Sequence, residues 1–153
     1  MTLEQWQSNG WLKPHTVTRR EVDNLLAIVR RDLIDARQNA ISDDWRFGIA
    51  YNAALKLCTV LLNAAGYRPS QNLAHYRTLQ ALPIILGAER KADAEYLDAC
   101  RTKRNVVEYD YINGATAADV DELIAFTESL DRDVREWLTR HNPHLIGVSE
   151  RSR

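Results

Sequence analysis

Apolar residues recur at helical spacing along most of this 153-residue chain. Positions three and four apart share one face of an α-helix, so this recurrence predicts amphipathic helices. The predicted helices span residues 3–10, 18–40, 42–66, 73–86, 91–111 and 116–142. Short connections separate them, which is typical of neighbouring antiparallel helices. We therefore expect an all-α protein folded as an antiparallel, up-and-down bundle of four or five helices.

Local signals mark the ends of these helices. Thr18 with Glu21, and Thr116 with Asp119, have the spacing of a capping box, and Ser42 is a typical N-cap residue. Glycine is the usual residue just past a helix end. The glycines that end predicted helices are Gly10, Gly66 and Gly87.

The same pattern divides the chain into three parts. Residues 1–17 form a short helix and a connector, residues 18–142 form the bundle, and residues 143–153 form a tail. Residues 67–72 read as a polar loop inside the bundle. Pro83 removes a backbone donor from the helix over residues 73–86, which predicts a kink or a restart there.

Composition limits the classes of partner. A net charge of −1 gives no global positive field that attracts nucleic acid, so any phosphate binding must be local. Cys58 and Cys100 lie on apolar helical stripes and read as buried thiols of a reducing compartment. No metal-ligand spacing is present, and we expect neither a metal nor another cofactor. No secretory signal and no unbroken apolar run of membrane length is visible, so we expect a cytoplasmic protein with no membrane association.

One predicted helix carries a permanent charge on its apolar face. Helical spacing aligns Leu97, Cys100, Arg104, Val107 and Tyr111 in one stripe. A guanidinium in such a stripe requires a carboxylate, a phosphate or a water-filled cleft.

Polar residues flank this stripe, namely Arg101, Asn105 and Glu108. Together with Arg104 they suggest an anion site or an RNA-phosphate site. The alternative is a structural Arg104 that pairs with an acid from a neighbouring helix. Spacing alone does not decide between these interpretations.

Residues 104–111, with the sequence Arg-Asn-Val-Val-Glu-Tyr-Asp-Tyr, resemble the signature of HEPN domains. In that signature an arginine, often followed by asparagine, precedes a histidine by four to six residues. In the toxins of HEPN–MNT pairs, a tyrosine follows two positions after the histidine. Arg104 matches the arginine, Asn105 the polar follower and Tyr111 the tyrosine, whereas Tyr109 occupies the histidine position. The helix order is also similar, so the resemblance extends over about residues 18–140.

The resemblance implies a HEPN-like bundle that often forms a homodimer, with the two arginine motifs facing each other in a shared cleft. It also implies metal-independent RNA cleavage in many members. There the histidine deprotonates or orients the ribose 2′-hydroxyl, and the arginine stabilises phosphate charge. Other members are binding or antitoxin modules without catalysis. By resemblance, Tyr111 is a candidate for nucleotidylation by a nucleotidyltransferase-type partner.

The departure at the histidine position affects the expected chemistry. Histidine accepts a proton near neutral pH, whereas tyrosine stays protonated there and is a poor general base. Glu108, Asp110 or His75 could take that role if the fold brings them near. The candidate catalytic residues are Arg104, Tyr109 and Glu108. The candidate RNA-binding or anion-binding residues are Arg101, Arg104, Asn105 and Tyr111.

Two function classes follow. The first is a HEPN-like RNA-associated protein, a degenerate or weak metal-independent RNase of a toxin–antitoxin or defence system. The second is a non-enzymatic dimeric interaction or antitoxin-type module in which Arg104 is structural; an unrelated bundle is a further alternative. The expected partners are a second copy of the chain, RNA and a nucleotidyltransferase-type protein.

Overall fold

The structure is a computed structural model that describes residues 1–109 and 112–147, except for the side chains of Glu108 and Tyr109. The predicted site residue Tyr111 therefore lies outside the described residues. The elements in chain order are α1 (Leu3–Ser8), β1 (Leu12–Pro14), α2 (Arg19–Asp35), α3 (Asp43–Ala64), β2 (Tyr67–Pro69), α4 (Ala74–Gln80), α5 (Leu82–Leu86), the 3-10 helix η1 (Ala88–Arg90), α6 (Lys91–Tyr109), α7 (Ala117–His141) and the 3-10 helix η2 (Pro143–Leu145).

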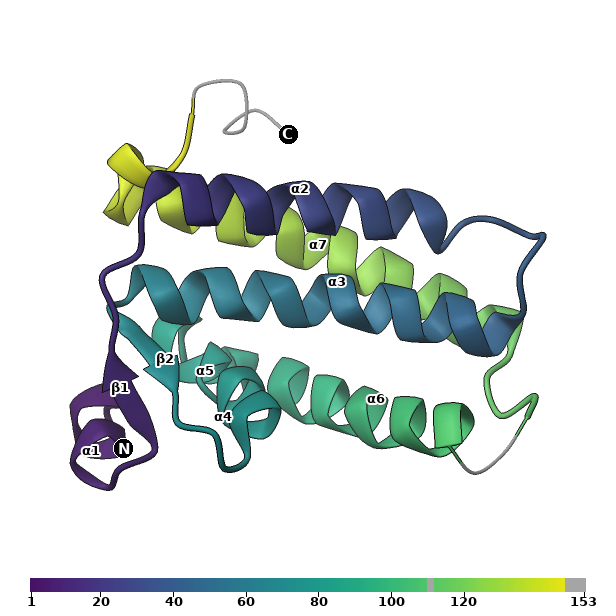
Figure 1. The fold of residues 1–153 in the computed structure, drawn as a ribbon, viewed down its shortest axis with the longest axis horizontal. Coiled ribbons are helices and arrows are strands. Elements are labelled where there is room, and N and C mark those ends of the chain that lie inside the picture. The colour runs from purple at the N-terminus through teal and green to yellow at the C-terminus, as the bar shows by residue number, and fades with distance from the viewer. Residues whose placement is uncertain (110–111, 148–153) are drawn as a thin grey trace.

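The four long helices form an antiparallel bundle. In Figure 1, α2, α3, α6 and α7 run alternately in opposite directions along the long axis of the molecule. Each buries an apolar row against its neighbours, and these rows meet in one core. The expected all-α, up-and-down bundle is confirmed.

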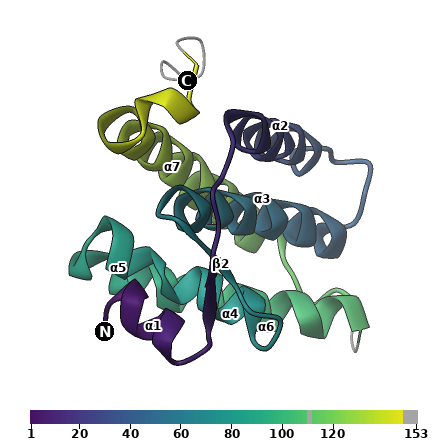
Figure 2. The ribbon, with the colours of Figure 1, turned by 60° about the vertical axis from the view of Figure 1, so that its left-hand side comes forward.

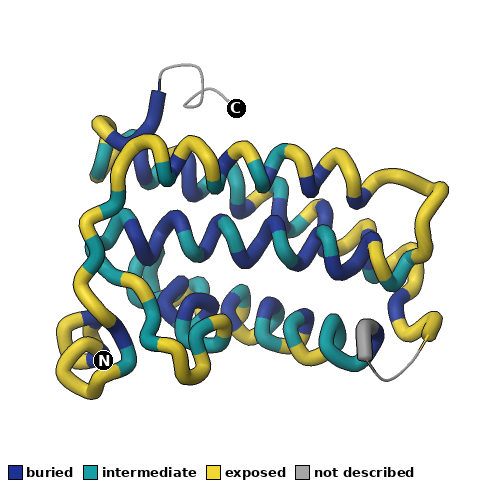
Figure 3. The backbone as a smooth tube through the Cα atoms, viewed as in Figure 1, coloured by how far each residue is buried: buried dark blue, intermediate teal, exposed yellow. Residues whose placement is uncertain are grey.

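The centre of the bundle is α3, which packs against α2, α6 and α7. Figure 3 shows it as a mostly buried tube between more exposed helices. Alanines at positions 50, 53 and 54 are fully buried and let the neighbouring helices approach closely. By length and composition alone α3 could cross a membrane, although its sequence contains no unbroken apolar run of membrane length. About two thirds of its most apolar stretch is buried within the bundle, as in the core helix of a soluble protein.

The predicted helix starts are confirmed. The side chains of Thr18, Ser42 and Thr116 each accept a hydrogen bond from a backbone N–H in the first turn of their helix. Of the two predicted capping boxes, the one at Thr116 forms in full. Glu21 does not return a bond to Thr18, because its carboxylate lies 2.8 Å from the imidazole of His15.

The end predicted for the helix that starts after Thr18 is wrong. That helix, α2, ends at Asp35 instead of continuing to residue 40. Ala36 is the last buried residue of this stretch, and residues 37–40 are exposed. The Ala36 carbonyl accepts a hydrogen bond of 2.7 Å from Nε of the buried Arg46 on α3. A side chain from the next helix thus satisfies the end of α2.

The predicted kink at Pro83 is confirmed as a restart. The helix expected over residues 73–86 is divided into α4 and α5, with Ala81 between them. Pro83 stands in the first turn of α5, where its missing N–H leaves no bond broken. The break allows α4 to turn its own face toward α6.

A small sheet replaces the expected connector and polar loop. β1 pairs antiparallel with β2, with Leu12 opposite Pro69. Beside the sheet, the Arg77 guanidinium lies 3.6 Å from the centroid of the Trp11 ring, a close cation–π contact. Figure 2 shows the two strands beside α4. The sheet and this stacking therefore fix the start of the chain and α4 together.

The residues after α7 continue the core for a few positions. Pro143 ends the helical pattern as expected, and η2 follows. Leu145 and Ile146 are buried in the main core. The rest of the tail predicted over residues 143–153 lies outside the described residues from residue 148 on.

Candidate functional site

The helix that carries the arginine motif is α6, and its inward row forms as predicted. Leu97, Cys100 and Val107 are buried. Arg104, in the same row, is half-buried, so it is neither a core residue nor fully solvated. A charge therefore interrupts the apolar row of α6, as the sequence predicts.

Arg104 lies against the central helix. Its Cζ atom is 5.9 Å from the centroid of the Tyr51 ring on α3. Its Nη1 atom donates a hydrogen bond of 3.3 Å to Oδ1 of Asn105. This bond uses the amide oxygen of Asn105 and leaves the amide NH2 group as a further donor beside the guanidinium.

Arg101 extends the site toward α4. Its Nε atom donates to Oδ1 of Asp98 at 2.9 Å, and both side chains are about 30% exposed. Its Cζ atom lies 5.9 Å from the centroid of the half-buried Tyr76 ring. Arg101 thus connects α6 with the neighbouring aromatic residue of α4 while part of it remains open to solvent.

His75, next to Tyr76, belongs to the same region. Leu73, the N-cap residue of α4, has a φ of 55° in the left-handed region, and α4 buries Thr78 and Leu79. His75 itself stays exposed. Partial desolvation, followed by the positive charges of Arg104, Lys56 and Arg101, lowers the pKa of His75 below its usual value of 6.5. The fold therefore brings His75 near the motif arginines, a condition that spacing along the chain could not establish.

These four residues define a cationic cluster: Lys56 on α3, His75 on α4, and Arg101 and Arg104 on α6. Figures 1 and 2 both show α4 beside α6, with α3 above them in each view. Every charge that shifts the His75 pKa is positive. The cluster also borders a carboxylate, because Asp98 accepts a hydrogen bond from Arg101, and the chain as a whole has a net charge of −1.

Tyr51 forms the buried side of the cluster, and sequence reasoning missed it. It is 1% exposed. Burial raises the pKa of its hydroxyl far above 10, although the charges of Arg101 and Arg104 act in the opposite direction. The sequence signal that could have identified Tyr51 as a buried residue is its position three residues before Ala54, on the same face of the helix.

The remaining predicted site residues cannot be placed relative to this cluster. Glu108 and Tyr109 are the last residues of α6, and their side chains lie outside the described part of the chain. Asp110 and Tyr111 lie outside it altogether. Of the predicted residues, the fold brings together Arg101, Arg104 and Asn105, and it adds His75.

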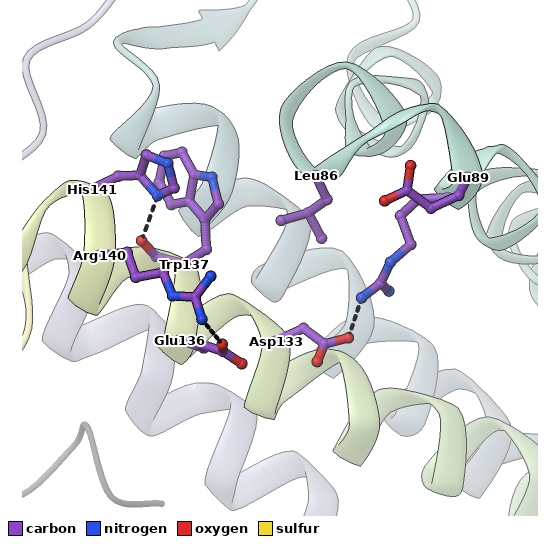
Figure 4. A pocket seen from close by; sticks show the side chains of 8 residues that line it. Leu86, Glu89, Asp133, Glu136, Trp137, Arg140 and His141 are labelled. Atoms are coloured by element: carbon purple, nitrogen blue, oxygen red, sulfur yellow. Dashed lines mark hydrogen bonds and ion pairs between the residues drawn. The ribbon is translucent and has the colours of Figure 1, made fainter.

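A hollow with a volume of about 170 Å³ lies between α5, η1 and the end of α7. Figure 4 shows its lining, where the Trp137 and His141 rings stack with centroids 4.7 Å apart. Its arginines are already paired. Arg90 binds both Asp93 and Asp133, and Arg140 lies 2.7 Å from Glu136. Carboxylates therefore pair with the arginines of this hollow.

Within residues 1–109 and 112–147, no three His, Cys, Asp or Glu side chains are grouped as metal ligands. Cys58 and Cys100 are buried free thiols, as their apolar stripes predict. Burial raises their pKa values to about 12 and about 11, so both stay protonated and unreactive at neutral pH.

The cationic cluster and its neighbours are mainly hydrogen-bond donors. The guanidinium, ammonium and amide groups match a ligand rich in acceptors, such as a phosphate. Comparison with models of known protein families, with curated proteins and with solved structures finds no match for this chain. The geometry of the cationic cluster and the resemblance at residues 104–111 therefore indicate the function.

Proposed function

We propose that this chain is a HEPN-like, RNA-associated cytoplasmic protein that binds RNA phosphates at the cationic cluster and cleaves RNA weakly, without a metal. One observation carries the proposal: cations of α3 and α6 lie around His75 of α4, beside the motif arginine. Like charges held close together repel one another, and a bound polyanion relieves this repulsion.

The neighbouring aromatic ring favours single-stranded RNA as the ligand. Tyr76 is half-buried and lies beside Arg101. Sites for single-stranded nucleic acid combine backbone-binding cations with rings on which bases stack. The toxin–antitoxin setting and the nucleotidyltransferase-type partner belong to the same proposal and are supported by the resemblance alone.

Arg104→Ala is expected to weaken the binding of a short oligouridylate about tenfold, because a charge-assisted phosphate contact is lost. Fluorescence anisotropy of a labelled oligonucleotide measures this. With two or three phosphate contacts, the slope of log affinity against log salt should be about −2 and become shallower by about 0.7 in the variant.

The matched control is Arg140→Ala. Arg140 is an exposed arginine at the end of α7 and is paired with Glu136, away from the cluster. The Arg140→Ala variant should bind RNA with the affinity of the wild type. Equal affinities for wild type and Arg104→Ala, both folded by circular dichroism, would exclude the cluster as the RNA site.

The binding of RNA is expected to depend on pH through His75. The pKa of His75 is lowered by its surroundings, so at pH 7 the ring is neutral and can act as a base beside Arg104. As the pH falls below this pKa, the ring gains a positive charge, and the anion binds more tightly. A bound phosphate raises the His75 pKa in turn, so binding takes up a proton.

Between pH 7 and pH 5 the affinity for oligouridylate should rise about two- to fivefold, the scale of one exposed ion pair. His75→Ala should abolish this rise, whereas His144→Ala, which removes an exposed histidine of η2, should preserve it. A pH profile unchanged in His75→Ala would remove His75 from the site.

A second candidate function, a dimeric interaction module, is favoured by exposed apolar side chains near the end of α6. Trp45 is 62% exposed and Ile112 is 86% exposed, and both line a hollow beside Val107. A homodimer formed there would lie close to the arginine motif, as the resemblance implies. Light scattering at micromolar concentration distinguishes a dimer from the 17.5 kDa monomer.

A further inference from the structure

The Tyr51 hydroxyl is a buried polar group without a hydrogen bond in the described part of the chain. The residue is 1% exposed, and its Oη atom has no partner there. Buried polar atoms are nearly always paired, because an unpaired one loses its hydration without compensation. The position of this hydroxyl beside the cationic cluster therefore requires an explanation.

The charged groups nearest to this hydroxyl are mainly donors. Arg101 and Arg104 both act on its titration, and neither guanidinium can accept a hydrogen bond. Asp98 also acts on it, but this carboxylate accepts from Arg101 at 2.9 Å. Since burial keeps the Tyr51 hydroxyl protonated, it too is available as a donor. A phosphate oxygen from outside the chain is an acceptor of the kind that this hydroxyl lacks.

We propose that Tyr51 is a ligand-binding residue whose hydroxyl donates a hydrogen bond to a phosphate oxygen held by Arg101 and Arg104. This inference rests on the proposed RNA-binding function and adds a neutral donor from α3 to it. Arg104 is half-buried against the Tyr51 ring, so it links the hydroxyl with the solvent side of the cluster. Movement of this guanidinium toward a phosphate exposes the hydroxyl to the same anion.

The direct test is Tyr51→Phe, which removes only the hydroxyl and keeps the ring that packs in the core. Oligouridylate affinity should fall about tenfold at pH 7, the size of one hydrogen bond to a charged group. The melting temperature in phosphate-free buffer should stay the same or rise, because an unpaired buried hydroxyl is removed. Inorganic phosphate should raise the melting temperature of the wild type more than that of the variant.

Tyr96→Phe is the matched control. It removes a hydroxyl from the same helix as the arginines, but its ring faces Phe126 of α7, with centroids 4.8 Å apart. Its RNA affinity should equal that of the wild type.

The outcomes separate this inference from the function on which it rests. If Arg104→Ala loses RNA binding while Tyr51→Phe keeps it and melts at a lower temperature, the hydroxyl serves only the fold, and the inference is overturned. If Arg104→Ala binds as the wild type does, the proposed function itself fails. Weakened binding by both variants, with an unchanged or higher melting temperature for Tyr51→Phe, supports the inference.

Discussion

Tyr109→His is expected to raise metal-independent RNA cleavage about 10²–10⁴-fold, the usual contribution of general acid–base catalysis. The variant places a residue that titrates near neutrality at the position where the resemblance implies the catalytic histidine. The arginine component is already present, because Arg104 lies at the solvent edge of the cationic cluster. Gel analysis of a labelled RNA in the presence of a chelator measures the rate.

Two further variants make this result specific. Adding Arg104→Ala to Tyr109→His should abolish the gained cleavage, and Tyr109→Phe should gain none. If the unaltered protein already cuts RNA efficiently in chelator, and Arg104 is required, the missing histidine is not the limiting feature. His75 or Glu108 then becomes the first base to test.

Asp44→Ala is expected to lower the free energy of unfolding by about 2–3 kcal/mol. The Asp44 carboxylate accepts two backbone hydrogen bonds from the α6–α7 loop, from Asn113 at 2.6 Å and from Ala115 at 3.0 Å. Asn113 has a φ of 60°, in the left-handed region, and these bonds help to hold it there. Asp44 also stands in the first turn of α3, at the positive end of the helix dipole.

Thermal denaturation should show this loss as a melting temperature about 5–10 °C lower. Asp44→Asn keeps an acceptor oxygen without the charge, so its melting temperature should lie between those of Asp44→Ala and the wild type. The control is Asp23→Ala, which removes an exposed aspartate 4.0 Å from Arg19 and should change the stability by less than about 0.5 kcal/mol. A wild-type melting temperature for Asp44→Ala would show that the carboxylate does not anchor the loop.

Much of the helical fold could be predicted because the signals are local. Thr18, Ser42 and Thr116 each cap the helix that follows within three residues, and Pro83 acts on its own turn. The apolar row of α6 also follows from spacing alone. Such features depend on neighbours in the chain, so a sequence pattern contains them.

Features that depend on distant residues could not be read in this way. The end of α2 depends on Arg46, which lies on the next helix. The strand pairing joins Leu12 with Pro69, and each strand has only three residues and contains a proline. So short a strand shows no alternation, and its partner is chosen by the tertiary fold.

The candidate site likewise contains residues that local spacing predicts and residues whose roles depend on tertiary packing. The motif predicted Arg101, Arg104 and Asn105, because they lie within two turns of one helix. His75 was a conditional candidate, since its distance from Arg104 depends on how α4 turns after the sheet. Tyr51 was missed because its role depends on which helix covers its hydroxyl. Long-range packing, and not residue type, decides both positions.

The most direct test of the central claim is an NMR titration of the 15N-labelled chain with a short single-stranded oligouridylate. We expect the largest amide shift changes at residues 74–80 and 98–105, on α4 and α6, with smaller changes around residue 51 of α3. The changes should weaken as salt is raised. Shift changes concentrated on α2 and α7, or none at millimolar RNA, would contradict RNA binding at the cationic cluster.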